Sequence, residues 1–359
     1  MVRDDRAAAF YSEQGGMMGE ETKKEGSWDN SGPDFMAVMK IASAYWSSRV
    51  LHAANRLELF TKLEGREAVA EELARDCNAD RRGLEILLIA CTSLGLLKRK
   101  EDKYSNTEVS SAFLVKGRER YQGGIVSMFD DWYTAWLGLP ESVVTGKPSV
   151  HKPHDISEGA TRNYIMGMHH RAVGQAYLLA DTIDLRGRKQ LCDIAGGPGT
   201  FTIFLCNKTP GLKGIVFDLP QTLRITKEVI KMFNAEDKVT TNEGDYLKDG
   251  FGSGHDAVLF SSMMNQESPE VNKKSFKKAF DSMVSGGLLI VQEQMLNAVK
   301  TGPELSALIG VNQLIHTPAG AAYSDKEIAG WIEEVGFRNI AQKPLAQWSP
   351  FTVLTAVKP

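Results

Sequence analysis

The chain has 359 residues, of which 42% are hydrophobic, and its charges nearly balance at a net −3. This length suggests two domains with substantial cores, and the interspersed charges argue against a nucleic-acid groove or an anionic membrane surface as partner. The absence of a long apolar run predicts no transmembrane helix. The four cysteines have no zinc or C-x-x-C spacing, and two of them, Cys192 and Cys206, lie in apolar runs where buried free thiols are expected, which fits a cytoplasmic protein.

The first part of the chain is polar and then helical. Residues 1–33 lack the apolar core of a signal peptide and are expected to form a flexible polar arm. Apolar residues recur at helical intervals from Phe35 to Leu63, and two more helices follow between Ala68 and Leu97, before a polar hairpin at 98–104. This order is typical of a winged helix. Its second helix is mostly Leu, Ile and Ala, so we expect no DNA binding.

The rest of the chain changes from helices to alternating strands and helices. Residues 121–146 and Glu158–Leu185 have helical patterns that carry several aromatic, methionine and histidine side chains. After Lys189, apolar strand-like segments alternate with helical ones, which predicts a doubly wound, mostly parallel sheet of α/β class. The final strand, with the segment from Phe337, is expected to form an antiparallel hairpin at the sheet edge.

A glycine-rich turn is the most informative motif. A strand ending near Asp193 leads into Gly196-Gly197-Pro198-Gly199 and a helix, and the next strand ends at Asp218. Glycines let a backbone pass close under a ligand, and an acid about twenty residues on can bind ribose hydroxyls. The segment therefore predicts a nucleoside cofactor.

The details of the turn favour S-adenosylmethionine over a dinucleotide. The third glycine of G-x-G-x-x-G is missing, and Pro198 removes an amide that a phosphate would use. Asp193 places a carboxylate beside the turn, which would repel a phosphate and suit a cation. S-adenosylmethionine carries an amino group and a sulfonium but no phosphate.

Four segments together resemble the two-domain S-adenosylmethionine-dependent small-molecule O-methyltransferases of the caffeate and acetylserotonin type. They are DIAGGPGTF at 193–201, VFDLP at 216–220, GDYLKD at 244–249 and SGGLLIVQE at 285–293. The resemblance covers about Phe35 to Pro359. It implies a winged-helix-like, mainly helical dimerisation domain at 34–150 and a Rossmann-like class I methyltransferase domain with a seven-stranded mixed sheet at 151–359, in which 151–188 is a linking helix. It also implies a homodimer.

The resemblance implies a cofactor site at matching positions. Gly196, Gly197 and Gly199 would approach the methionine and ribose, Asp218 would bind the ribose, and Leu219 would pack on adenine. Asp245, after Gly244, would meet the adenine amino group with Tyr246 nearby. Ser261 and Ser262 lie where the family contacts the cofactor again. No metal-ligand spacing is present in the sequence, so no metal site is predicted.

The chain departs from this family at the general base. The family uses a histidine just after the fourth strand, and the corresponding residue here is Asn265, whose amide cannot take a proton. His169 or His170 is one candidate for another base, and Glu293 resembles the acid that orients the family histidine in plant members.

Other acceptors need no base. A thioether acid, as in the methylthiohydroxybutyrate methyltransferases of dimethylsulfoniopropionate synthesis, or an ionised carboxylate has a free lone pair, and Arg162, Arg171 or Asn312 would then hold the carboxylate. A relative with different cofactor chemistry and a non-catalytic dimeric regulator are further alternatives. We expect the small-molecule acceptor to lie against residues of the helical and loop segments, namely Trp132, Trp136, Tyr164, Met166, Met168, Met264, Asn312 and His316.

Overall fold

A computed structural model describes residues 34–150, 158–346 and 349–359. The predicted polar arm at 1–33 lies outside these residues. The chain divides into two compact units, of which the first ends at Ser47 and the second begins at Ser48. Helix α1 (Phe35–Arg56) crosses that boundary. None of the helices in the described ranges is long and apolar enough to cross a membrane.

Short elements follow α1 and share one small core. The predicted helix pair and hairpin are present, and the described strands of this region pair antiparallel in the order β1-β3-β2. Leu73, Leu88 and Tyr104 are buried in the shared core. The elements are α2 (Leu59–Lys62), β1 (Ala68–Val69), α3 (Ala70–Asp76), α4 (Arg81–Ser93), β2 (Leu97–Lys100), β3 (Lys103–Asn106) and α5 (Glu108–Phe113).

Three helices lead from this region to the large sheet: α6 (Gly123–Trp136), α7 (Leu139–Thr145) and α8 (Glu158–Thr182). Asp130 on α6 is buried, and its carboxylate forms ion pairs with Arg49 and Arg56 near the end of α1. A buried carboxylate needs such partners because desolvation penalises its charge. This cluster therefore fixes α6 to the last turns of α1.

The remaining strands form the predicted mixed sheet. Within the described residues it has seven strands in the order β6-β5-β4-β7-β8-β10-β9. The first five are parallel, and β10 is antiparallel to both of its neighbours. The strands are β4 (Gln190–Ile194), β5 (Lys213–Asp218), β6 (Val239–Glu243), β7 (His255–Ser261), β8 (Met283–Glu293), β9 (Arg338–Pro344) and β10 (Thr352–Val357).

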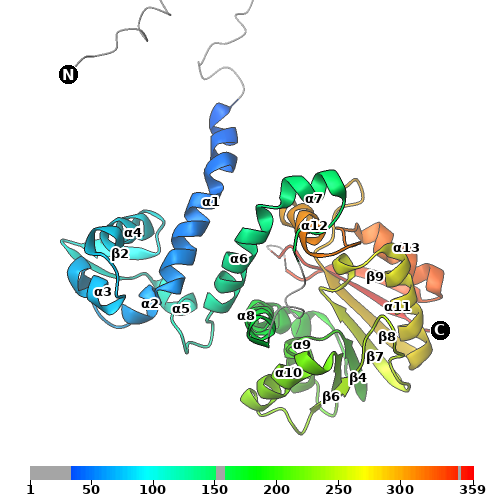
Figure 1. Cartoon of the computed structure of the whole chain (residues 1–359). Helices are drawn as coiled ribbons and strands as arrows, with labels where there is room; N and C mark the ends of the chain where they lie inside the picture. The colour runs from blue at the N-terminus through cyan, green and yellow to red at the C-terminus, as the bar shows by residue number, and fades with distance from the viewer. Residues whose placement is uncertain (1–33, 151–157, 347–348) are drawn as a thin grey trace, which may run out of the picture. The chain divides into compact units, whose positions relative to one another are not determined.

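Helices cover the two faces of this sheet (Figure 1). Helices α8, α9 (Thr200–Lys208) and α10 (Pro220–Met232) contribute to a core with Leu191 and Val216, and α11 (Pro269–Ser282) and α13 (Asp325–Val335) contribute to a core with Phe260 and Phe276. All four cysteines are free and buried, which confirms the prediction for Cys192 and Cys206. The strand order reverses beside β4, so the carboxyl ends of β4 and β7 diverge into a crevice where ligands bind in such sheets.

Candidate active site

The glycine turn has the backbone geometry that the sequence predicts. Gly197 and Gly199 have φ values of 55° and 73°, and α9 begins immediately after the turn. The Gly199 amide donates to the Gly196 oxygen at 2.9 Å, which closes the turn. A Cβ added at Gly197 would meet no atom within 4 Å, whereas one at Gly199 would press on Val216 at 3.0 Å. Gly197 therefore faces open space, and Gly199 serves the packing of the turn.

Asp218, at the end of β5, binds this turn directly. The Gly197 amide donates to one carboxylate oxygen at 2.8 Å, and the Leu219 amide donates to the other at 2.7 Å. Both oxygens therefore lie in fixed positions at the mouth of the crevice. A carboxylate oxygen accepts more than one hydrogen bond, so each retains capacity toward a ligand.

Asp193 is fully buried beneath the turn. One of its oxygens accepts a 2.6 Å hydrogen bond from the Thr202 hydroxyl, and the other has no partner among the described residues. Burial raises the pKa of Asp193 to about 7, because desolvation penalises the carboxylate and the charge of Asp218 adds to the effect. A buried oxygen without a partner costs free energy, which a cationic ligand group would recover.

A larger pocket of about 1330 Å³, partly open to solvent, lies at the carboxyl ends of β4, β5, β6 and β7. Of the cofactor residues expected from the sequence, all except Gly199 line it. Its lining also includes residues that the sequence did not single out. The predicted residues on its wall are Asp193, Gly196, Gly197, Asp218, Leu219, Gly244, Asp245, Tyr246 and Ser261.

Two of these residues have side-chain partners that fix them. The Tyr246 hydroxyl donates to Glu267 at 2.6 Å, and burial raises the pKa of Tyr246, so this phenol stays protonated. The Asp245 carboxylate pairs with Lys248 at 2.9 Å, and this contact lowers the pKa of Asp245. Both side chains are therefore held in one protonation state at the pocket wall.

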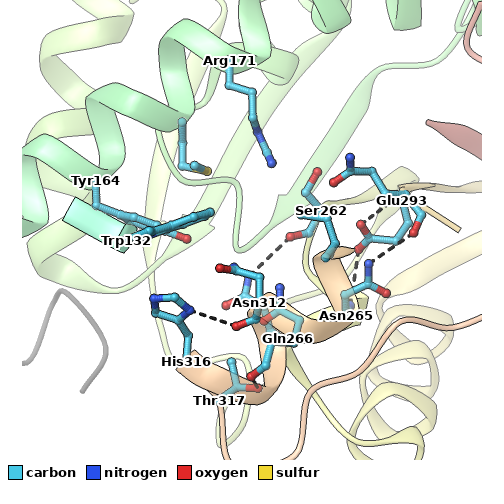
Figure 2. Close-up of a pocket in the computed structure, with 14 residues that line it drawn as sticks. Trp132, Tyr164, Arg171, Ser262, Asn265, Gln266, Glu293, Asn312, His316 and Thr317 are labelled. Carbon is cyan, nitrogen blue, oxygen red and sulfur yellow. Dashed lines mark hydrogen bonds between the residues drawn. The ribbon is translucent and has the colours of Figure 1, made fainter. Parts of the chain in front are cut away.

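A smaller pocket of about 700 Å³, also partly open, adjoins the first. The residues common to both are Tyr164, Met168, Arg171, Ser262 and Gln266. The first three lie on α8 at intervals of four and three residues, which places them on one helix face. Figure 2 shows Trp132 and Tyr164 on one side of the smaller pocket, and Asn265 and Glu293 on the other. A ligand here would lie beside a ligand in the larger pocket.

Helix α12 (Glu304–His316) supplies a fixed pair of polar side chains to the smaller pocket. Trp136 donates from its indole nitrogen to the Asn312 side-chain oxygen at 3.1 Å, which leaves the Asn312 amide NH₂ for other acceptors. His316 Nδ1 lies 2.9 Å from the Asn312 backbone oxygen (Figure 2). A carbonyl oxygen only accepts, so Nδ1 carries the proton. In neutral His316 the lone pair is therefore on Nε2.

His316 is neutral near pH 7. Burial lowers the pKa of His316 below its usual 6.5, although the hydrogen bond to Asn312 opposes this effect. Its ring centroid lies 5.3 Å from that of Trp132, and the two ring planes are tilted by 45°. This histidine can therefore accept a proton from a ligand in the smaller pocket.

Asn265 lies in a short 3-10 helix (Met264–Gln266) between β7 and α11. Its side-chain nitrogen donates to the Gln294 backbone oxygen at 3.4 Å, and its side-chain oxygen is buried without a partner among the described residues. Such an oxygen can accept a hydrogen bond and so orient a hydroxyl group. It cannot remove the proton.

Glu293 holds the segment that carries Asn265. Its two oxygens accept hydrogen bonds from the backbone amides of Met264, Asn265 and Gln294 at 3.0, 3.4 and 2.9 Å. Burial raises the pKa of Glu293, and these amide hydrogen bonds and the charge of Arg171 oppose the rise. The carboxyl group therefore supports the shape of the pocket wall.

The predicted catalytic residues His169 and His170 and the predicted acceptor residue Met264 line neither pocket. His169 and His170 follow Met168 on α8 and so turn away from the face of Tyr164, Met168 and Arg171. His169 is buried with its Nδ1 2.8 Å from the Thr200 hydroxyl, and burial lowers the pKa of His169 to about 4. His170 contacts the ring of Tyr121. The Met264 side chain is buried in the core on the α11 face of the sheet.

Of the two arginines that the sequence offered for binding an acceptor carboxylate, only Arg171 lines the pockets. Arg162 is exposed and forms a two-point ion pair with Glu228 at 2.7 and 2.9 Å. Arg171 lines both pockets. Met166 packs against the core around α8, and Trp136 acts through Asn312.

Several residues of the smaller pocket had no sequence signal. They are amides and small polar groups on segments whose position depends on tertiary structure: Gln266, Gln294, Gln313 and Thr317. Ile309 also lines this pocket. It lies three residues before Asn312 on the same face of α12, so the helical period could have indicated it. No group of three potential metal ligands occurs among the described residues.

Comparison with known proteins finds O-methyltransferases by family models and by individual relatives. A model described as the O-methyltransferase domain matches residues 141–338, and one for the O-methyltransferase dimerisation domain matches residues 39–116. The 3-hydroxy-5-methyl-1-naphthoate 3-O-methyltransferase of Streptomyces sahachiroi is 33% identical over 325 residues, which is 89% of this chain and 94% of that protein. The Streptomyces glaucescens tetracenomycin polyketide synthesis 8-O-methyl transferase TcmO is 25% identical, over 90% and 96%.

Solved structures agree on the fold. The human N-acetylserotonin methyltransferase, in complex with S-adenosylmethionine, superposes with a TM-score of 0.82 and 24% identity, over 92% of this chain and 99% of that one. At this identity the likeness establishes the fold.

Proposed function

Because the chain belongs to the O-methyltransferase family, whose members use S-adenosylmethionine, we propose that it methylates a hydroxyl group of a small aromatic acid. The observation that carries this proposal is His316, a neutral histidine with its lone pair on Nε2 in the smaller pocket. A hydroxyl acceptor must lose a proton when it is methylated. His316 supplies the base that Asn265 cannot provide.

The larger pocket fits S-adenosylmethionine by its own chemistry. Gly197 opens toward the crevice, the fixed oxygens of Asp218 suit two ribose hydroxyls, and the unpartnered oxygen of Asp193 suits an ammonium group. A Cβ at Gly244 would strike Phe217 at 2.2 Å, so the wall there is tight. The bound cofactor supplies an electrophilic methyl group on a sulfonium. The chain's residues then position the acceptor and receive its proton.

The ionisation of Asp193 predicts a pH dependence of cofactor binding. An ionised Asp193 attracts the ammonium of S-adenosylhomocysteine, and a protonated one does not. Since the pKa of Asp193 is raised to about 7, the affinity should rise with pH through that value. Calorimetric titrations of wild-type protein over that range, and of Asp193→Asn, provide the measurement. The variant should bind more weakly above pH 7 and show a flat profile.

A ligand control and a variant control test whether this pH dependence comes from Asp193. The ligand 5′-methylthioadenosine lacks the amino acid part, so its binding to wild-type protein should not vary with pH in this range. Asp184→Asn removes an exposed carboxylate that pairs with Arg186 and should leave the profile unchanged. A wild-type affinity for S-adenosylhomocysteine that does not change between pH 6 and 8 would contradict the role given to Asp193.

The lining of the smaller pocket supports a flat, partly polar acceptor. Trp132 and Tyr164 offer aromatic surfaces, Met168 and Ile309 add apolar contact, and the Asn312 amide offers a hydrogen-bond donor. Aromatic side chains favour stacked or edge contacts with other rings. The Streptomyces sahachiroi relative acts on a hydroxynaphthoate. We infer an acceptor of that general class for this chain.

Asn265 favours a second candidate function, S-methylation of a thioether acid. A thioether sulfur has a free lone pair and loses no proton, so an amide in place of the family histidine would be sufficient. His316 would then have no proton to accept. The other two hypotheses, different cofactor chemistry and a non-catalytic regulator, are not carried forward, because membership in a methyltransferase family together with a retained donor pocket favours methyl transfer.

A matched set of acceptors tests the proposal. Purified protein with S-adenosylmethionine is offered 3-hydroxy-1-naphthoate, 1-naphthoate and a methylthio-substituted hydroxy acid, and the rate of S-adenosylhomocysteine formation is measured. We expect turnover with the hydroxynaphthoate and none with the naphthoate that lacks the hydroxyl. Turnover restricted to the thioether acid would support the second candidate instead.

We also propose that residues 34–150 form the dimerisation domain of a homodimer, and residues 151–359 the methyltransferase domain. Within the first compact unit, Val38, Ile41 and Trp46 are exposed although apolar. Such a surface is typical of a protein interface. Light scattering after size-exclusion chromatography should give a dimer mass, and Ile41→Glu with Trp46→Glu should give a monomer mass. A wild-type monomer would contradict the proposal.

A further inference from the structure

Arg171 is the feature that the proposed reaction leaves unexplained. It extends from α8 toward the middle of the smaller pocket (Figure 2) and also lines the larger one. It has no hydrogen bond or ion pair with any described residue, and its guanidinium lies over the Phe351 ring, with Cζ 5.9 Å from the ring centroid. The guanidinium remains charged in proteins. A cation in this position needs an anionic partner.

Among the described residues, no group near Arg171 provides that partner. Glu293 lies close enough to influence its charge, but the Glu293 oxygens accept three backbone amides and form no ion pair with it. Among the described residues that line the two pockets, Arg171 is the only lysine or arginine. A single cation in a pocket whose lining also includes Asp193 and Asp218 suits an anion of one charge. A phosphate would need more positive charge.

We propose that Arg171 binds a carboxylate group where the two pockets meet. The planar guanidinium offers two parallel donors that match the two oxygens of a carboxylate. The carboxylate has two possible sources, the methionine part of the cofactor in the larger pocket and the aromatic acid in the smaller pocket. The inference rests on the proposed function only for the second source.

Binding measurements distinguish the two sources without any turnover. S-adenosylhomocysteine and 5′-methylthioadenosine share the adenosine thioether, but only the first carries the amino acid carboxylate. If Arg171 binds the cofactor, Arg171→Met should weaken S-adenosylhomocysteine about 10- to 100-fold and leave 5′-methylthioadenosine unchanged. If it binds the acceptor, both nucleosides should bind as before. In that case 1-naphthoate, measured in the presence of S-adenosylhomocysteine, should lose affinity while 1-naphthol does not.

Arg162→Met is the matched control, because Arg162 lies on the same helix but pairs with Glu228 on the surface. It should leave all four affinities unchanged. Arg171→Lys keeps the positive charge but lacks the two parallel donors of the guanidinium, so it should recover part of the lost affinity. Equal weakening of both nucleosides by Arg171→Met, or no change in any of the four ligands, would overturn the inference. Failure of the wild-type protein to bind S-adenosylhomocysteine would instead contradict the cofactor assignment.

Discussion

Replacement of Asp218 with alanine should weaken binding of S-adenosylhomocysteine about 100-fold or more. The substitution removes a carboxylate whose oxygens accept the Gly197 and Leu219 amides and face the ribose position. Hydrogen bonds to a charged group contribute about 1.5–3 kcal/mol each, and about 1.4 kcal/mol corresponds to tenfold in affinity. The glycine turn also loses an anchor. Isothermal titration calorimetry of wild-type and variant protein measures the difference.

Asp256→Ala provides a matched control for this variant. Asp256 also accepts two backbone amides, from Lys189 and Gln190 at 2.6 and 2.9 Å, but it lies near the amino end of β7, opposite to the crevice. Its loss should lower the melting temperature and leave the affinity of the folded protein unchanged. Asp218→Asn should give an intermediate affinity. If Asp218→Ala binds S-adenosylhomocysteine as wild type does, the cofactor lies elsewhere.

Replacement of His316 with alanine should lower kcat about 100- to 1,000-fold at pH 7, with little change in cofactor affinity. Loss of a general base typically has an effect of this size. In the wild-type enzyme the rate should fall as the pH drops below 6.5, because protonated His316 cannot accept a proton and burial lowers the pKa of His316 from that value. The variant should lack this decline. Steady-state rates across the pH range on a hydroxynaphthoate provide the measurement.

The alkaline range separates a base from a structural role. A phenol acceptor ionises near pH 10 (about the value for tyrosine), after which it needs no base. The defect of His316→Ala should therefore shrink as the pH rises toward that value, whereas a loss of pocket shape would persist. Asn265→Ala is the comparison, since its oxygen can orient the hydroxyl but cannot take the proton. A larger loss for Asn265→Ala than for His316→Ala would contradict the assignment of the base.

Much of the fold follows from local sequence patterns. Strand segments such as 190–194 and 213–218 are short apolar runs bounded by glycine and charged residues, and their order predicts the parallel sheet that the structure has. The turn at Gly196–Gly199 and the acid at Asp218 form a motif within thirty residues. Such features can be predicted because they depend on the local backbone preferences of glycine and of short apolar runs.

The smaller pocket was harder to predict because it depends on which face a helix turns inward. Apolar residues occur all around α8, so its pattern does not distinguish His169 from Arg171. Tertiary packing places Tyr164, Met168 and Arg171 on the pocket face and turns His169 toward Thr200. The role of His316 likewise depends on a hydrogen bond to the Asn312 backbone oxygen. No sequence motif encodes that tautomer.

The proposed function requires that the methyl group is transferred to an acceptor oxygen. The most direct test supplies S-adenosylmethionine with a ¹³C-labelled methyl group and a hydroxynaphthoate, and then identifies the labelled carbon of the product by its NMR shift. We expect the signal of a methoxy carbon, and the signal should fall strongly in His316→Ala at pH 7. A labelled methyl on sulfur with a thioether acid, and no methoxy product with any hydroxynaphthoate, would contradict the claim.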